Sequence, residues 1–195
     1  VHGELVRNAF AAPGVAVVRF PPAADPFELV AAAASRPGNA LIVAPSIAQA
    51  RHLGIRLRRA GLPVATLPND WPSARAGATV VGSRAAAWAP MADLSSVVLL
   101  DEHDEVHQEE RAPTWHARDV LVERARRAGA PCVLVSPSPT LESLAIADRV
   151  LVPSRKAERQ GWPITDVIDM RGEDPLRGGL ISERLAVLVQ DGRRI

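Results

Sequence analysis

Seven short apolar runs, separated by segments with helical periodicity, constrain the fold of this chain more than any other feature. They are rich in valine and leucine and are bounded by glycine, proline or serine, as buried strands are. The runs fall at residues 14–20, 40–45, 63–67, 78–83, 96–100, 132–136 and 149–154. Two intervening segments, residues 46–61 and 114–129, place apolar side chains on one face and arginine on another, and each ends at a glycine. We expect helices there, with Thr114 as the N-cap of the second.

Alternation of strands and helices predicts an α/β fold, in which a mostly parallel sheet carries helices on both faces and ligands lie outside the carboxyl ends of its strands. The pattern loosens after Pro153, and one further amphipathic helix is expected at residues 182–190. We therefore predict a domain at residues 1–153 and a connector at residues 154–195. The chain begins without Met and ends in DGRRI, so we expect it to be a piece of a longer protein.

Composition narrows the class of protein without deciding its function. The chain has 195 residues, of which 47% are hydrophobic and 23% charged, as in an ordinary globular domain. A net charge of +1 indicates no strong field for a nucleic-acid partner. Cys132 lies in an apolar run and is interpreted as a core residue of a protein in the reducing cytoplasm. No apolar run is long enough for a membrane span, so we expect no membrane partner.

The stretch VVLLDEHDEVH, residues 97–107, delivers acidic side chains to the end of a predicted strand. Three interpretations are open. Asp101, His103, Asp104 and His107 could bind a metal, although their spacing is not the HExxH arrangement. The carboxylates could hold Mg²⁺ against a nucleotide. We favour the third interpretation, an acidic turn satisfied by nearby arginine or water, with no metal bound.

The loop after the first predicted strand does not suit a nucleotide. A phosphate-binding loop needs glycine, free backbone N–H groups and a lysine. The sequence here is RFPPAADPFELVAAAA, without GK[ST]. Pro21, Pro22 and Pro26 each lack an N–H donor, and Asp25 adds negative charge where a phosphate would sit. We interpret this segment as a plain loop before a helix.

Three segments resemble the first helicase lobe of the PriA family of replication-restart proteins. They are VVGSRAAAWAP at residues 80–90, LLDEHDEVHQEERAPTWHARDVLVERA at residues 99–125, and LVSPSPTLESL at residues 134–144. LIVAPSIAQA falls where the family has its motif Ia, and ITDVIDMRGEDPLRGGLISERL where the family links to a second lobe. The resemblance implies a RecA-like fold of the P-loop NTPase type. It also implies that ATP and Mg²⁺ serve active members, and that the family's zinc cysteines belong to a region outside this chain.

All three ATP motifs of the family are altered together in this chain. PPAADPF stands where active members have GSGKT, and VSPSPT stands where they have GSATPS. Where active members have DEEH, this chain has either Leu100, Asp101, Glu102 and His103 without a gap, which puts leucine at the Mg²⁺ carboxylate, or Asp101, Glu102 and His103 with one residue deleted. This form resembles the actinobacterial branch, which is regarded as lacking helicase activity. We therefore expect a degenerate P-loop, no catalytic residues and no cofactor in this chain.

DNA contact does not depend on ATP chemistry, because phosphate contacts need only donors and positive charge. In the family, motif Ia and the GSR motif face the DNA backbone. The predicted DNA-binding residues, including a supplementary arginine face on one helix, are Ser46, Arg51, Arg56, Arg58, Arg59, Ser83 and Arg84. The arginines could instead form only a solvated helix face. Trp88 could stack on a base, although packing is the simpler interpretation.

From these observations we predict a DNA-binding or scaffolding lobe of a PriA-like protein in replication restart, rather than an enzyme. The expected partners are DNA, branched or forked, and other primosome proteins. The alternative is an ATP-dependent 3′–5′ DNA helicase lobe with an atypical nucleotide site.

Overall fold

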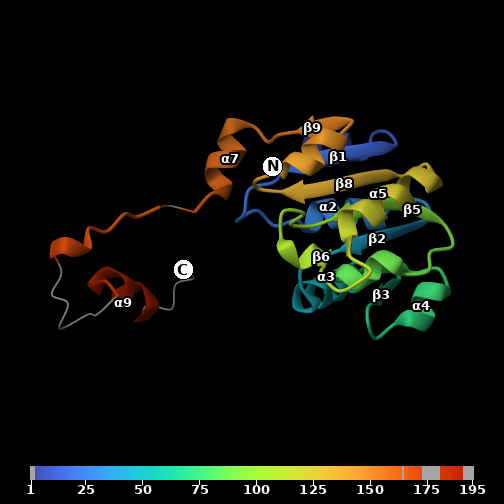
Figure 1. Ribbon diagram of the computed structural model, residues 1–195, viewed down its shortest axis with the longest axis horizontal. Coiled ribbons are helices and arrows are strands. Elements are labelled where there is room, and N and C mark those ends of the chain that lie inside the picture. Colours follow the sequence, from blue (N-terminus) through green and yellow to red (C-terminus); the bar gives the residue numbers. More distant parts are fainter. Residues whose placement is uncertain (1–2, 164, 173–180, 191–195) are drawn as a thin grey trace. The chain divides into compact units, whose positions relative to one another are not determined.

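The computed structural model describes residues 3–163, 165–172 and 181–190 (Figure 1). The chain divides into a compact unit that ends at Trp162 and a second unit that begins at Pro163. The first unit contains every strand of the described chain and every residue of the candidate site. None of the described helices is long and apolar enough to cross a membrane.

A parallel sheet of seven strands forms the centre of the first unit, in the order β3-β4-β2-β5-β8-β1-β9, and all six of its pairings are parallel. The strands are β1 (Gly14–Arg19), β2 (Asn39–Val43), β3 (Val64–Thr66), β4 (Thr79–Gly82), β5 (Leu94–Leu99), β8 (Pro131–Ser136) and β9 (Arg149–Leu151). Each corresponds to one of the seven apolar runs, which confirms the predicted fold class. Parallel pairing places the carboxyl ends of all seven strands at one edge of the sheet.

Helices cover both faces of the sheet, as Figure 1 shows. The elements with helical geometry in this unit are α1 (Gly3–Ala9), α2 (Phe27–Ala34), α3 (Ile47–Arg59), α4 (Trp71–Arg75), η1 (Arg84–Trp88), η2 (Glu105–His107), α5 (Ala117–Ala128), α6 (Leu141–Ile146) and α7 (Arg155–Gly161). Successive strand residues alternate between two buried clusters. Val98 belongs to the same cluster as Leu29 of α2 and Leu53 of α3, whereas Val97 belongs to the other cluster with Leu121 of α5. Burial on both faces explains why the strands are almost wholly apolar.

Two sequence expectations about helix ends and the core can now be judged. Gly129 closes α5 in a left-handed conformation, with φ 63°, as predicted. The predicted N-cap at Thr114 is wrong. Residues 115–116 form the short strand β7 (Trp115–His116), which pairs with β6 (Gln108–Glu109), so the helix begins only after this strand. The N-cap is His116, whose Nδ1 accepts from the Arg118 N–H. Cys132 is fully buried, as expected, and burial raises the pKa of its thiol to about 12.

Helix α7 extends the compact unit beyond the predicted boundary at Pro153. Its last residue, Gly161, lies so close to Pro21 that a Cβ atom there would overlap the proline ring. The Gly161 carbonyl accepts a hydrogen bond from the Ala23 N–H at 2.9 Å, and Glu158 pairs with Arg19 at 2.5 Å. The start of the predicted connector is therefore packed onto the loop after β1. The predicted role of residues 154–195 as a link to a second lobe stays a prediction.

The second unit contains η3 (Met170–Gly172) and α9 (Glu183–Gln190). Helix α9 confirms the helix expected at residues 182–190, and at its start the Ser182 hydroxyl accepts from the Leu185 N–H. Arg184 pairs with Asp166 at 2.8 Å within this unit. Part of the predicted connector, residues 173–180, lies outside the described residues.

Candidate functional site

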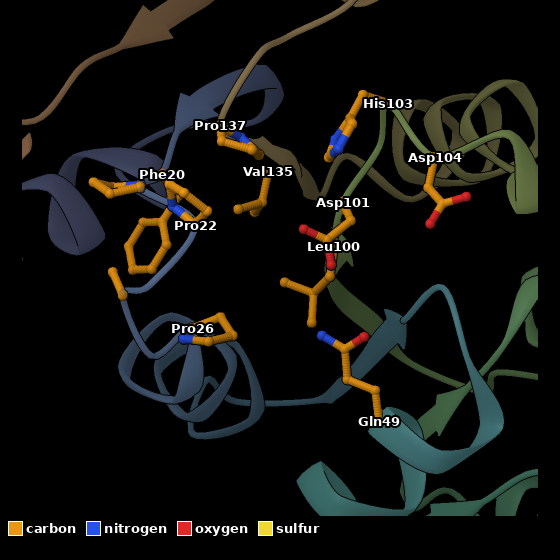
Figure 2. A pocket seen from close by; sticks show the side chains of 12 residues that line it. Phe20, Pro22, Pro26, Gln49, Leu100, Asp101, His103, Asp104, Val135 and Pro137 are labelled. Carbon is orange, nitrogen blue, oxygen red and sulfur yellow. The ribbon is translucent and has the colours of Figure 1, made fainter. Parts of the chain in front are cut away.

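A pocket of about 240 Å³ lies at the carboxyl edge of the sheet, where a ligand is expected in this architecture (Figure 2). The loops after β1, β5 and β8 and the first turn of α3 enclose it. Its lining residues are Phe20, Pro21, Pro22, Ala24, Pro26, Gln49, Leu100, Asp101, His103, Asp104, Val135 and Pro137. The volume is below the usual range of roughly 300–1,000 Å³ for pockets that hold drug-sized ligands.

The loop after β1 offers few backbone donors to a phosphate, because most of its N–H groups are missing or used. The three prolines have none. Ala23 donates to the Gly161 carbonyl and Ala24 to the Pro21 carbonyl. The Phe27 N–H, at the start of α2, donates to the Asp25 carboxylate at 3.0 Å. The helix N-terminus that would attract an anion is thus occupied by a carboxylate of the protein itself.

The charges near the pocket also disfavour a nucleotide. The Asp25 carboxylate receives two hydrogen bonds from the Arg56 guanidinium, at 2.8 and 2.6 Å, and this contact holds the pKa of Asp25 below its usual value. Arg56 is in turn stacked over the Phe27 ring at 3.9 Å. No lysine or arginine is among the residues that line the pocket, whereas Asp101 and Asp104 are. The β1 loop and the charges around the pocket therefore do not fit ATP with Mg²⁺. We derive no catalytic step that uses this nucleotide.

Glu102, the second acidic residue after β5, is buried and fully engaged by the loop after β8. Its side chain is 1% exposed. The Thr140 N–H donates to Oε1 at 2.8 Å, and the Thr140 and Ser143 hydroxyls both donate to Oε2. Thr140 is also the N-cap of α6, with its hydroxyl accepting from the Ser143 N–H. Glu102 therefore acts as a structural acceptor that ties the β5 turn to the β8 loop.

Neighbouring residues of the acidic stretch have different partners. His103 Nδ1 lies 2.9 Å from the Ser136 hydroxyl at the end of β8. The Asp104 carboxylate accepts from the Val106 N–H at 3.0 Å. His107 is buried, and its Nε2–H donates to the Leu100 carbonyl at 2.9 Å. Among the described residues, no three histidine, cysteine or acidic side chains gather as a metal site would require.

Asp101 differs from the other acidic residues of the site. Its backbone is left-handed, with φ 50°, the only such non-glycine residue in the described ranges. Figure 2 shows its side chain directed into the pocket. Within those same ranges its carboxylate has no hydrogen bond or ion pair, so of the two partners expected for the acidic turn, arginine or water, arginine is not observed at Asp101.

Three predicted DNA-binding residues lie together at the carboxyl edge. Strands β2 and β4 are neighbours, with Val43 opposite Gly82, so Ser46 follows one strand end and Ser83 and Arg84 follow the other. Ser46 is the N-cap of α3 and accepts from the Gln49 N–H. Arg84 is committed to the fold: it donates to the carbonyls of Val106 and Gln108 and pairs with Glu109 at 2.8 Å.

The predicted arginine face of α3 is divided. Arg56 pairs with Asp25, and Arg58 pairs with Asp70 at 2.7 Å and donates to the Val64 carbonyl and the Thr66 hydroxyl. Arg51 and Arg59 are exposed and have no hydrogen bond or ion pair to any described residue. Arg59 ends a helix that begins after Ser46, so it lies about 20 Å along the helix axis from the carboxyl edge. Ser46, Ser83 and Arg84 therefore form one group, and Arg58 and Arg59 do not belong to it.

Sequence reasoning missed the residues that hold this site together. It identified PTLES only as a family motif, without assigning Thr140 and Ser143 to Glu102. It predicted that Asp25 would repel a phosphate, and it did not identify Arg56, 31 residues away, as the partner of Asp25. Trp88 is 59% exposed and meets Trp115 edge to face, with ring centroids 5.4 Å apart. Trp88 thus packs against Trp115 and is otherwise largely exposed, so the choice between packing and base stacking stays a prediction.

The class of protein follows from the fold. The helicase domain of Hef from Pyrococcus furiosus superposes with a TM-score of 0.55 at 12% identity, over 80% of this chain and 39% of that one. The UvsW helicase of bacteriophage T4 superposes with a TM-score of 0.52 at 12% identity, over 70% and 54% of the two chains. These likenesses concern the fold alone, and they define it as RecA-like.

Comparison of the sequence with those of known proteins gives more specific relatives than comparison of the fold does. The chain is similar to replication restart protein PriA of Bacillus subtilis, with 36% identity over 104 residues, 51% of this chain and 13% of that protein. It is 41% identical to PriA of Chlamydia pneumoniae over 76 residues, 37% of this chain and 10% of that protein. Haemophilus influenzae PriA is 27% identical over 134 residues, 64% of this chain and 18% of that protein. The chain thus spans less than a fifth of each of these relatives. No model of a protein family matches the sequence.

Proposed function

We propose that the chain is a DNA-binding and scaffolding lobe of a PriA-like protein in replication restart and primosome assembly, without ATPase or helicase activity. The observation that carries this proposal is the loop after β1. Its prolines lack donors, and the N–H groups of Ala23, Ala24 and Phe27 are already bonded within the protein. A motor lobe that binds ATP needs those donors for the phosphates.

Similarity to PriA supports the restart part of the proposal, and with it DNA, branched or forked, and other primosome proteins as partners. The group formed by Ser46, Ser83 and Arg84 supports DNA contact, because hydroxyls and guanidinium groups are typical phosphate ligands. Arg51 is exposed five residues after Ser46, where the second turn of α3 begins, and can add positive charge near them. Arg84 contributes from a fixed position, since Glu109 and two carbonyls hold its guanidinium.

The DNA part is tested by fluorescence anisotropy with branched DNA on the longest form of the protein, at several salt concentrations. We expect Arg51→Gln to weaken binding and to reduce the magnitude of the log–log salt slope by about 0.9. Base sequence should matter little, because backbone contacts position a protein without reading bases.

Arg127→Gln is the matched control. Arg127 lies near the end of α5, exposed and paired only with Glu123 one turn earlier, so the substitution removes the same charge away from the proposed surface. Equal effects of the two substitutions would mean that only net charge matters. No effect of Arg51→Gln would exclude Arg51 from the contact, and absence of DNA binding by the unmodified protein would leave protein scaffolding as the function of the lobe.

One observation favours a second candidate, an ATP-dependent 3′–5′ DNA helicase lobe with an atypical nucleotide site. The β5 turn still connects to the β8 loop through Glu102, and Asp101 is still directed into the pocket. A DNA-stimulated ATPase assay on the full-length protein separates the two candidates. Turnover that is lost in Asp101→Asn would establish the enzyme.

A further inference from the structure

The pocket at the carboxyl edge combines apolar walls with uncompensated negative charge. Eight of its twelve lining residues are proline, alanine, leucine, valine or phenylalanine, and the prolines come from two different loops. Of the remaining four, two are aspartates, and neither lysine nor arginine is present among the twelve. Two arginines close to the β1 loop are already paired, Arg56 of α3 with Asp25 and Arg19 at the end of β1 with Glu158. A ligand of this pocket must therefore offer both apolar surface and positive charge.

Asp101 is the group that such a ligand would meet. The other carboxylates around the pocket have donors of their own: Asp25 has Arg56, Asp104 has the Val106 N–H, and Glu102 has Thr140 and Ser143. The Asp101 carboxylate has none among the described residues, although it is partly buried and directed inward (Figure 2). A partly buried carboxylate without a partner loses hydration without recovering hydrogen bonds.

The shape and chemistry of the pocket select the kind of cation. A metal ion would need several oxygen or nitrogen ligands, and no such cluster is found in the described chain. An arginine side chain carries an aliphatic stem, which suits the proline walls, and a planar, weakly hydrated head with five donors. Asp101 can accept two of those donors side by side, and the side-chain amide of Gln49, which also lines the pocket, offers an oxygen as a further acceptor.

We propose that this pocket is a docking site for an arginine side chain of a partner protein, whose guanidinium pairs with Asp101 between the β1 and β8 loops. The proposal rests on the proposed function, because the arginine would occupy the position of the nucleotide. Charge complementarity selects this occupant over an anionic one. The site would thus join the lobe to another protein through the edge that a motor lobe uses for ATP.

The test is isothermal titration calorimetry of the full-length protein with the tripeptide acetyl-Gly-Arg-Gly-amide as the probe. The same peptide with norleucine in place of arginine keeps an aliphatic stem and lacks the charge. We expect saturable binding of the arginine peptide only. Asp101→Asn should weaken this binding about tenfold or more, and asparagine also tolerates the left-handed backbone, so the fold is kept.

Asp93→Asn is the matched control, because Asp93 is exposed before β5, at the opposite edge of the sheet, and loses the same charge. Equal binding by wild type and Asp101→Asn, or no binding of the arginine peptide, would overturn the inference. An added titration with ATP and Mg²⁺ keeps the two proposals apart. Binding of ATP would contradict the proposed function, whereas failure of the peptide alone would contradict only the arginine site.

Discussion

The loop after β1 and the turn after β5 border the same pocket, yet their polar groups are used differently. In the β1 loop most backbone donors are absent or bonded to nearby groups, and α7 packs against it through Gly161 and Glu158. In the β5 turn the buried Glu102 still reaches across to Thr140 and Ser143 after β8. The comparison teaches that an acidic residue at the end of a buried parallel strand can serve as a buried hydrogen-bond acceptor between two loops. Its presence does not establish catalysis.

The largest loss of stability should come from a substitution in the β5 turn. Replacing Glu102 by alanine leaves the Thr140 N–H and two hydroxyls without their acceptor in a buried site. We expect the free energy of unfolding to fall by about 2–4 kcal/mol, because unsatisfied buried donors are costly. Denaturant unfolding followed by circular dichroism measures this loss.

Glu105→Ala is the control for that substitution, because Glu105 is exposed in η2, three residues further on. It should change stability by less than about 0.5 kcal/mol. If the two alanine variants are equally stable, Glu102 has no structural role and the comparison between the two regions fails.

A pH effect should follow from His107, which extends the β5 turn into the core. Burial lowers the pKa of this imidazole, so the folded protein holds it neutral where the unfolded chain would take up a proton. Stability is therefore lost as the pH falls below about 6.5, the pKa of an unfolded histidine, by at most about 1.4 kcal/mol per pH unit for this group. Denaturant unfolding between pH 7.5 and 5.5 measures it, and His107→Gln should flatten the dependence. An unchanged slope in that variant would assign the pH effect to other groups.

The ion pair of the β1 loop should contribute less to the free energy of unfolding than the hydrogen bonds of Glu102 do. Asp25 and Arg56 form a bidentate pair, but the Asp25 side chain is 58% exposed, so solvent screens the interaction. We expect Asp25→Asn to reduce stability by at most about 1 kcal/mol near neutral pH. Because the folded pKa of Asp25 is lowered by Arg56, its contribution is present above the unfolded pKa near 3.9 and is lost as the pH falls through the folded value. A loss at pH 7 larger than that for Glu102→Ala would reverse the ranking of the two regions.

Local patterns in the sequence were sufficient for most of the fold and for little of the site. Seven apolar runs and the glycine after residue 128 specify strands and a helix end, because burial and backbone conformation are decided by neighbouring residues. The pairing of Glu102 with Thr140, and of Asp25 with Arg56, joins residues 38 and 31 positions apart. Such contacts depend on the order of strands in the sheet, which local periodicity does not contain. The strand at Trp115 was missed for the same reason, since it exists only through pairing with Glu109.

The central claim, that this lobe does not bind ATP, is tested most directly by thermal unfolding of the longest form of the protein at increasing concentrations of ATP with Mg²⁺. The quantity measured is the melting temperature of this lobe. A site that binds ATP and is filled to a hundred times its Kd would stabilise the folded state by about 2.7 kcal/mol, which corresponds to roughly 5–10 °C for a domain of this size. Because the β1 loop retains few free donors and the pocket carries negative charge, we predict no change in the melting temperature of this lobe. A rise that saturates with ATP concentration and disappears in Asp101→Asn would contradict the account.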